Sequence, residues 1–186
     1  MKPLAFFVHS TGGSPQETFY PWLKRELEKL DFKVDAPQFP MPEYQTLDNW
    51  MDVARPFFKN FDETTIMLGR SVGCPMVLRI LEAVDVKINA AFLVASFSSG
   101  PFTPDFQPVL KTFVEKPWAW AKIRGNAKRF FVYHSDNDPY LPLEKGEEVA
   151  RNLKTDLTLV KGAGHFGLNG GFTQFPLLLK DVKSVL

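Results

Sequence analysis

The sequence predicts an α/β protein in which an open, mostly parallel six-stranded sheet carries helices on both faces. Two observations support this fold class. Short apolar runs alternate along the chain with longer segments of helical periodicity. Six of these runs have the character of strands and are separated by helical segments, which is the arrangement that builds parallel sheets. The length of 186 residues suits one core, so we expect a single domain over residues 1–186.

The predicted strands are apolar runs of the kind that a sheet covered on both faces requires. The first run, LAFFVH at residues 4–9, is apolar at every position except the last. The remaining five strands are expected at residues 32–37, 64–69, 88–96, 129–135 and 156–162.

The segments between these strands carry the spacing of amphipathic helices. In residues 18–30, Phe19, Leu23 and Leu27 recur at every fourth position with charged residues between them. Further helices are expected at residues 47–61, 75–84, 118–123, 143–153 and 174–186.

Two segments interrupt this alternation. Pro56 falls inside the second helical segment and predicts a kink near Arg55, because proline cannot donate a backbone hydrogen bond. Residues 97–117 contain four prolines and four phenylalanines between the fourth strand and the next helix. Such a segment is either a short lid-like insertion or an irregular loop that seals the core, and both interpretations remain open.

Composition excludes several classes of protein. The 22 basic and 21 acidic residues nearly cancel, so no overall field attracts nucleic acid or an anionic membrane. No window is long and apolar enough for a membrane span or a signal peptide. A single cysteine, Cys74, rules out an internal disulfide and is expected to be a buried packing residue. These features together predict a cytoplasmic protein.

The stretch GRSVG at residues 69–73 places a serine between two glycines where a strand gives way to a helix. A turn this sharp holds Ser71 in a strained conformation above the sheet, and the residues two before and two after it must be small. Gly69 and Gly73 meet that requirement. The turn also directs the helix N-terminus at Ser71, which favours negative charge there. Ser71 is therefore a candidate nucleophile.

A serine nucleophile needs a base and an acid that orients the base. His165 lies in a glycine-rich loop after the last predicted strand and is the candidate base, whereas His134 is better explained as a core histidine. Asp138 begins a D-P-x-x-P turn after the fifth strand and is the candidate acid, and Asp136 is interpreted as a turn residue.

The order Ser71, Asp138, His165 along the chain is the order found in α/β-hydrolases. All three residues follow a predicted strand, so they are expected at one edge of the sheet. An oxyanion formed at that edge needs two donors, for which the candidates are the backbone amides of Val72, after the nucleophile, and Thr11, in the glycine-containing loop after the first strand. These two loops flank the expected switch point of the sheet.

The chain resembles the small serine hydrolases related to retinoblastoma-binding protein 9, a branch of the α/β-hydrolases. The likeness extends over nearly the whole length. It includes the elbow GRSVGC, the segment FVEKPWAWAKIRGNAKRFFVYHSDNDPYLP and the loop GAGHF, of which PWAWAKI and DNDPYLP are the most specific. The resemblance implies an α/β-hydrolase fold without a large cap and a triad of Ser71, Asp138 and His165.

Two features depart from the pattern. The superfamily usually has histidine before the nucleophile, where this chain has Arg70. Arg70 either pairs with a nearby acid in a structural role or faces the pocket and favours an anionic substrate group. The retinoblastoma-binding motif L-x-C-x-E is absent, so the resemblance implies no binding of that partner.

The leading hypothesis is an acyl hydrolase acting on a small ester or amide, with carboxylesterase-like or aminopeptidase-like specificity. The phenylalanines of residues 97–113, with Trp118 and Trp120, suggest an apolar pocket wall. The pocket candidates are His9, Arg70, Phe97 and Phe166. No cofactor and no metal are expected, because three scattered histidines and one cysteine make a poor ligand set. The alternative is a non-catalytic interaction protein that uses exposed aromatic residues of 97–120 as its partner surface.

Overall fold

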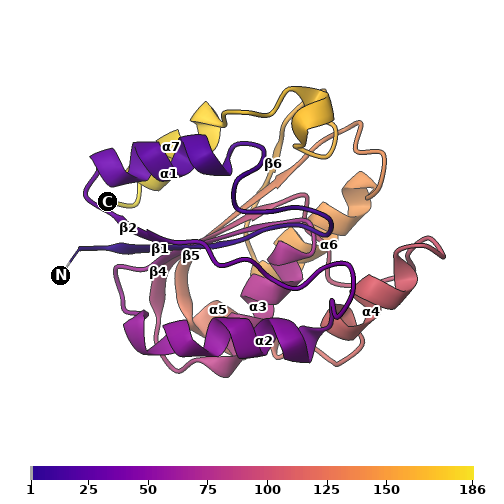
Figure 1. Ribbon diagram of the computed structural model, residues 1–186, viewed down its shortest axis with the longest axis horizontal. Coiled ribbons are helices and arrows are strands. Elements are labelled where there is room, and N and C mark those ends of the chain that lie inside the picture. Colours follow the sequence, from indigo (N-terminus) through magenta and orange to yellow (C-terminus); the bar gives the residue numbers. More distant parts are fainter. Residues whose placement is uncertain (1) are drawn as a thin grey trace.

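A computed structural model describes residues 2–186, which form a six-stranded parallel sheet in the order β2-β1-β3-β4-β5-β6 (Figure 1). This confirms the predicted fold class. Each of the six predicted runs forms a strand, and the two edge strands, β2 and β6, are the shortest. The strands are β1 (Leu4–Val8), β2 (Lys33–Asp35), β3 (Ile66–Arg70), β4 (Ile88–Val94), β5 (Ala127–His134) and β6 (Leu157–Leu159).

The strand order reverses at β1, which lies between β2 and β3, as the sequence predicts. In the register of β1 against β3, Val8 is opposite Gly69. Because all strands are parallel, the loops that follow them gather at one edge of the sheet. The crevice between the β1 and β3 loops is the position where open α/β sheets bind ligands.

Helices lie between successive strands, and a last one follows β6. Of the predicted helices, 143–153 has the expected bounds, those at 18–30, 47–61 and 174–186 are shorter, 75–84 begins two residues earlier, and 118–123 is shifted by two residues. One further helix, α4, forms within residues 97–117. The elements are α1 (Tyr20–Lys29), α2 (Leu47–Ala54), the 3-10 helix η1 (Arg55–Asn60), α3 (Gly73–Ala83), α4 (Gln107–Val114), α5 (Trp120–Gly125), α6 (Leu143–Leu153), the 3-10 helix η2 (Leu168–Gly170) and α7 (Pro176–Lys183).

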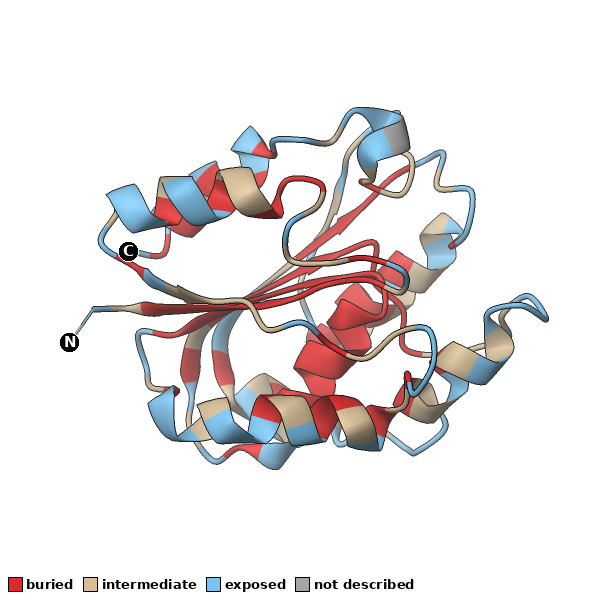
Figure 2. Cartoon of the chain, in the orientation of Figure 1, coloured by how far each residue is buried: buried red, intermediate tan, exposed pale blue. Residues whose placement is uncertain are grey.

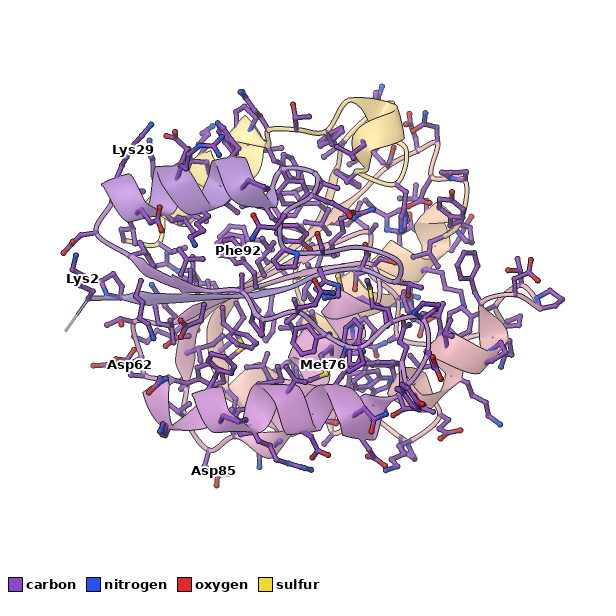
Figure 3. All side chains as sticks on the ribbon, in the orientation of Figure 1. Lys2, Lys29, Asp62, Met76, Asp85 and Phe92 are labelled. Carbon is purple, nitrogen blue, oxygen red and sulfur yellow. The ribbon has the colours of Figure 1, made fainter. Side chains whose placement is uncertain are left out.

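Helices cover both faces of the sheet. In Figure 1, α1 and α7 lie on one face, and α2, α3 and α5 lie on the other. Phe92 of β4 belongs to the core on the α1 and α7 side, whereas Met76 belongs to the core on the α2 side (Figure 3). The burial pattern follows this layering, since strands and inward helix faces are buried and outward faces are exposed (Figure 2). Every residue of β1 and β3 is buried, as expected for strands covered on both sides.

The helix predicted over residues 47–61 breaks instead of kinking. The amide of Arg55 still bonds to the carbonyl of Met51, but Pro56 has no amide hydrogen for the next bond. The chain therefore leaves the α-helix at Ala54 and continues as the 3-10 helix η1.

Within residues 2–186, no helix combines the length and the apolar character that crossing a bilayer requires.

Candidate active site

Ser71 occupies the turn between β3 and α3 in the strained conformation that its sequence context predicts. Its φ of 54° lies in the left-handed region, which is uncommon for a residue other than glycine. An added Cβ at Gly69 would lie 2.4 Å from the carbonyl oxygen of Gly73, and one at Gly73 would lie 2.2 Å from that of Val8. Both glycines are therefore required by close backbone approach. The amide of Ser71 donates to Val94 at 2.9 Å and ties the turn to β4.

His165 and Asp138 are joined by a hydrogen bond. Nδ1 of His165 lies 2.7 Å from Oδ2 of Asp138, whose side chain is almost fully buried. The other carboxylate oxygen accepts the amides of Tyr140 and Leu141. Burial by itself raises the pKa of Asp138, but these hydrogen bonds and the adjacent His165 outweigh it and hold the pKa below its ordinary value. The carboxylate is thus kept ionised beside the imidazole.

Three successive residues after β5 hold the loop that carries His165. Besides Asp138, Asp136 accepts the amide of Gly162 and Asn137 accepts the amide of Gly164, each at 2.8 Å. Asp136 is therefore a loop-fixing residue, in keeping with its interpretation as a turn residue. These contacts limit the movement of the imidazole, which needs a fixed orientation to act as a base.

Thr11 and Val72, whose backbone amides are the candidate oxyanion donors, occupy the loop after β1 and the position directly after Ser71. Thr11 and Ser71 line the same cavity, and neither the Thr11 nor the Val72 amide donates a hydrogen bond to another described residue. The Thr11 hydroxyl accepts from Gln45 at 2.9 Å, and Gln45 also donates to the carbonyl of Val109 in α4. Gln45 therefore fixes the loop after β1 against α4.

His9 is a buried residue that supports this loop from behind and does not line the cavity. The amide of Phe39 donates to its Nε2 at 2.9 Å, so Nδ1 carries the proton and donates to the carbonyl of Ser10. Burial lowers the pKa of His9 and keeps the ring neutral. The ring packs edge-on against Trp50, on the α2 side of the sheet.

Arg70 bridges two loops of the site. Its Nε donates to the carbonyl of His165 at 3.1 Å, and its Nη1 donates to the hydroxyl of Ser10 at 2.9 Å. The acidic partner proposed for Arg70 is not found in the described residues, where its acceptors are neutral. The side chain is buried yet also lines the cavity. Arg70 therefore combines a positioning role with a position in the pocket wall.

A cavity of about 490 Å³ opens above Ser71. Arg70 and Phe97 are the pocket candidates that line it. Phe166 does not, because it is fully buried in the core on the α7 side and packs against Phe172 and Phe175. The lining residues are Ser10, Thr11, Arg70, Ser71, Phe97, Pro101, Phe102, Thr103, Phe106, Leu110, Pro139, Tyr140, Leu141, Pro142, Lys145 and His165.

Residues 97–117 form a short cap over this cavity, which favours the lid interpretation over the irregular loop. On α6, Glu148 accepts the hydroxyls of Ser98 and Ser99, and Lys145 donates to Ser99 and to the carbonyl of Gly100. Trp118 and Trp120 do not line the cavity. They pack on each other, and Trp118 also stacks under Arg79.

Several cavity residues were not singled out from the sequence, and Tyr140 and Lys145 are the two with polar groups of most consequence. Tyr140 contacts the His165 ring edge-on at 5.0 Å between centroids and meets Phe106 of the cap at 6.0 Å. Lys145 reaches the cavity from α6. Tyr140 stands two residues after Asp138, and this closeness in sequence to a catalytic candidate is the feature that could have predicted its place in the cavity. No local pattern marks Lys145.

The remaining histidine and the cysteine are buried beside the site. His134 donates from Nε2 to the carbonyl of Leu141, but its Nδ1 has no partner among the described residues, so it is only partly satisfied. Cys74 is fully buried, its thiol donates to backbone carbonyls, and burial raises its pKa to about 12. Such a thiol is a packing residue, as predicted. The described residues contain no group of three or more metal-binding side chains.

The chain is similar in sequence to known serine hydrolases. A family model described as serine hydrolase matches residues 5–184. Serine hydrolase RBBP9 of Rattus norvegicus is 30% identical over 188 residues, with 98% of this chain and 95% of the relative covered. YdeN of Bacillus subtilis is 27% identical over 186 residues, with 99% and 96% covered.

Solved structures show the same fold. The crystal structure of the ydeN gene product superposes with a TM-score of 0.92 at 26% identity, covering 98% of each chain. The esterase RhEst1 from Rhodococcus sp. ECU1013 superposes with a TM-score of 0.69 over 100% of this chain and 92% of that one. At 16% identity, the second similarity concerns the fold alone.

Proposed function

Because the chain belongs to the serine hydrolase family, we propose that it cleaves small esters or amides with Ser71 as nucleophile, His165 as general base and Asp138 as the orienting acid. The observation that carries this proposal is the 2.7 Å hydrogen bond between His165 and Asp138. It commits Nδ1 of His165 to the carboxylate and leaves Nε2 free in the cavity that Ser71 lines.

The first half of the proposed reaction forms an acyl-enzyme. The Ser71 hydroxyl attacks the substrate carbonyl carbon while Nε2 of His165 takes the hydroxyl proton. The carbonyl oxygen becomes an oxyanion, and the free amides of Thr11 and Val72 are the donors that stabilise it. When the tetrahedral intermediate collapses, the alcohol or amine leaves with the proton from Nε2, and the acyl group remains on Ser71.

The second half releases the acyl group. Water takes the place of the leaving group, gives a proton to Nε2 and attacks the acyl carbon. Collapse of the second tetrahedral intermediate returns the proton to Ser71 and frees the carboxylic acid. In the described structure Ser71 donates no hydrogen bond to the His165 ring, and such bonds tighten in many enzymes only when the substrate binds.

The cavity indicates the size of the substrate. A volume of about 490 Å³ and a wall with several apolar residues of the cap suit a small acyl group. The apolar residues of this wall fit the side chains of carboxylesterase and of aminopeptidase substrates alike. A panel of p-nitrophenyl esters and amino-acid anilides distinguishes the two.

The structure gives little support to the alternative of a non-catalytic interaction protein. Of the aromatic residues at 97–120, Phe106 is exposed, at 36%, whereas Phe97 and Phe113 are fully buried and Phe102, Trp118 and Trp120 are half-buried. Most of the aromatic surface that a partner would need is therefore turned inward.

Covalent labelling with a neutral fluorophosphonate tests the proposed function. We expect the wild type to be labelled and the variants Ser71→Ala and His165→Ala to be unlabelled while keeping the wild-type circular dichroism spectrum. Ser184→Ala, at an exposed serine near the C-terminus, is the matched control and should label normally. A folded wild type that does not label overturns the proposal and favours the interaction protein.

A further inference from the structure

The cavity above Ser71 has an unbalanced charge. Arg70 and Lys145 line it, and none of its described lining residues carries a carboxylate. The neighbouring carboxylates of Asp138 and Glu148 are engaged elsewhere, Asp138 with His165 and Glu148 with the hydroxyls of the cap. A substrate in this cavity therefore meets two cationic side chains from different elements of its wall.

Arg70 keeps donor capacity that the protein does not use. Its Nε and Nη1 bond to His165 and Ser10, but Nη2 bonds to none of the described residues. Nη2 is also absent from the buried polar atoms without a partner, so it is not sealed from solvent, and the Arg70 side chain lines the cavity. The two loop contacts hold the guanidinium in place before a ligand arrives. A fixed guanidinium with a free N–H group is a good receptor for a carboxylate.

Lys145 adds a second fixed charge. Its Nζ lies 2.7 Å from the carbonyl oxygen of Gly100 and 3.0 Å from that of Ser99. Its third contact is the Ser99 hydroxyl at 3.1 Å. All three acceptors are neutral, and the Glu148 carboxylate shares the Ser99 hydroxyl with Lys145 without pairing directly with the ammonium group. At the cavity wall, where water is partly excluded, such a charge acts more strongly than in bulk water.

The rest of the wall is largely apolar. Phe97, Phe102, Phe106 and Leu110 come from the cap and its approach, and Leu141 comes from the loop after β5. Building on the proposed function, we propose that the preferred substrates are esters with an apolar body and a carboxylate on either the acyl part or the leaving group. Arg70 then binds this carboxylate through its free N–H group, and Lys145, whose three N–H groups are engaged, attracts it by charge.

Matched ester pairs test the proposal. The acyl arm compares p-nitrophenyl hexanoate with the mono-p-nitrophenyl ester of adipic acid, which has the same chain length and a terminal carboxylate. The leaving-group arm compares the hexanoate esters of 4-hydroxybenzoate and of its neutral methyl ester. We expect kcat/KM to favour the carboxylate in one arm by roughly tenfold, as a charge-assisted hydrogen bond supplies. The preference should shrink with added salt.

Variants assign the preference to its residues. Arg70→Gln and Lys145→Gln should each reduce the ratio of anionic to neutral kcat/KM, whereas Arg70→Lys and Lys145→Arg should retain most of it. Because Arg70 also positions His165, its substitution can lower activity on both esters. Such a general loss affects the anionic and the neutral kcat/KM equally and leaves their ratio unchanged, so the ratio is the readout. Lys111→Gln, which removes an exposed charge of α4 that does not line the cavity, is the matched control and should leave the ratio unchanged.

The outcomes separate this proposal from the proposed function. If the wild type labels with fluorophosphonate but prefers the neutral ester in both arms, the selection of a carboxylate is overturned and the hydrolase stands. A carboxylate preference that survives in both Gln variants also overturns it. Absence of labelling and of all ester hydrolysis refutes the proposed function itself.

Discussion

His165 donates from Nδ1 to Oδ2 of Asp138 across 2.7 Å, and Arg70 holds the carbonyl of the same histidine at 3.1 Å. His165 is thus fixed both through its ring and through its backbone carbonyl. The ring contact determines which nitrogen carries the proton, and the backbone contact determines where the loop lies.

Asp138→Asn should lower kcat for ester hydrolysis by about 10³- to 10⁴-fold, because an amide that donates to Nδ1 favours the wrong histidine tautomer. Steady-state kinetics at neutral pH, with fluorophosphonate labelling rates, measure the effect. Asp136→Asn is the matched control, since the Gly162 amide is the one hydrogen-bond partner of Asp136 among the described residues, and it should cost less than roughly tenfold. Equal losses in both variants would assign Asp138 to loop structure instead of catalysis.

Two buried histidines should make the protein less stable in mild acid. Burial lowers the pKa of His9 and of His134 below the ordinary value of 6.5. The unfolded chain then binds more protons than the folded one, so the stabilisation is complete above about pH 6.5 and is lost as the pH falls through the folded-state pKa values. Asp138, whose pKa is also lowered, contributes to acid loss only below about pH 4.

The free energy of unfolding, measured by urea denaturation between pH 7 and pH 5, should therefore fall with decreasing pH. His134→Gln removes one of the two titrating groups and should flatten this slope, whatever it does to stability at pH 7. A slope unchanged by the substitution would show that His134 does not titrate with unfolding.

Gly73→Ala should destabilise the protein by at least about 2 kcal/mol, because the added methyl group collides with the rigid backbone of β1. An added Cβ would lie 2.2 Å from the carbonyl oxygen of Val8 and 2.9 Å from that of His9. Gly125→Ala is the control, since no atom lies within 4 Å of its added Cβ. Urea denaturation measures both, and a neutral Gly73→Ala would contradict the close approach of α3 to β1.

Sequence reasoning succeeded where local constraints determine the structure. Continuous apolar runs identify the strands that helices cover on both faces. The close backbone approach at Gly69 and Gly73 requires glycine at both positions, so the five-residue stretch GRSVG is recognisable in the sequence. The positions of Asp138 and His165 after successive strands bring them to one edge of the sheet by topology alone.

The same reasoning failed where tertiary contacts decide the direction of a side chain. His9 follows β1, but its ring does not line the cavity and instead accepts the amide of Phe39, thirty positions along the chain. Phe166 adopts a φ of 52°, unusual for an aromatic residue, which no local pattern reveals and which accompanies its burial in the core. Lys145 enters the cavity wall only because the cap folds back onto α6.

Arg79→Lys should loosen the cap. The buried guanidinium of Arg79 donates to the carbonyls of Phe113, Lys116 and Pro117, and it stacks 3.6 Å from the ring centroid of Trp118. A lysine ammonium lacks the planar fork needed to reach these carbonyls together, so we expect a loss of about 2 kcal/mol in the free energy of unfolding.

Hydrogen exchange of the α4 amides should accelerate in this variant more than exchange in β3 or β4, because the cap carbonyls lose their anchor while the sheet keeps its bonds. The KM for a neutral ester should rise with little change in kcat, since α4 lines the cavity through Leu110 but contributes no reacting group. Arg151→Lys, at an exposed position of α6, is the matched control and should leave exchange and KM unchanged. Uniform acceleration across sheet and cap would mean that Arg79 supports the whole fold and not the cap in particular.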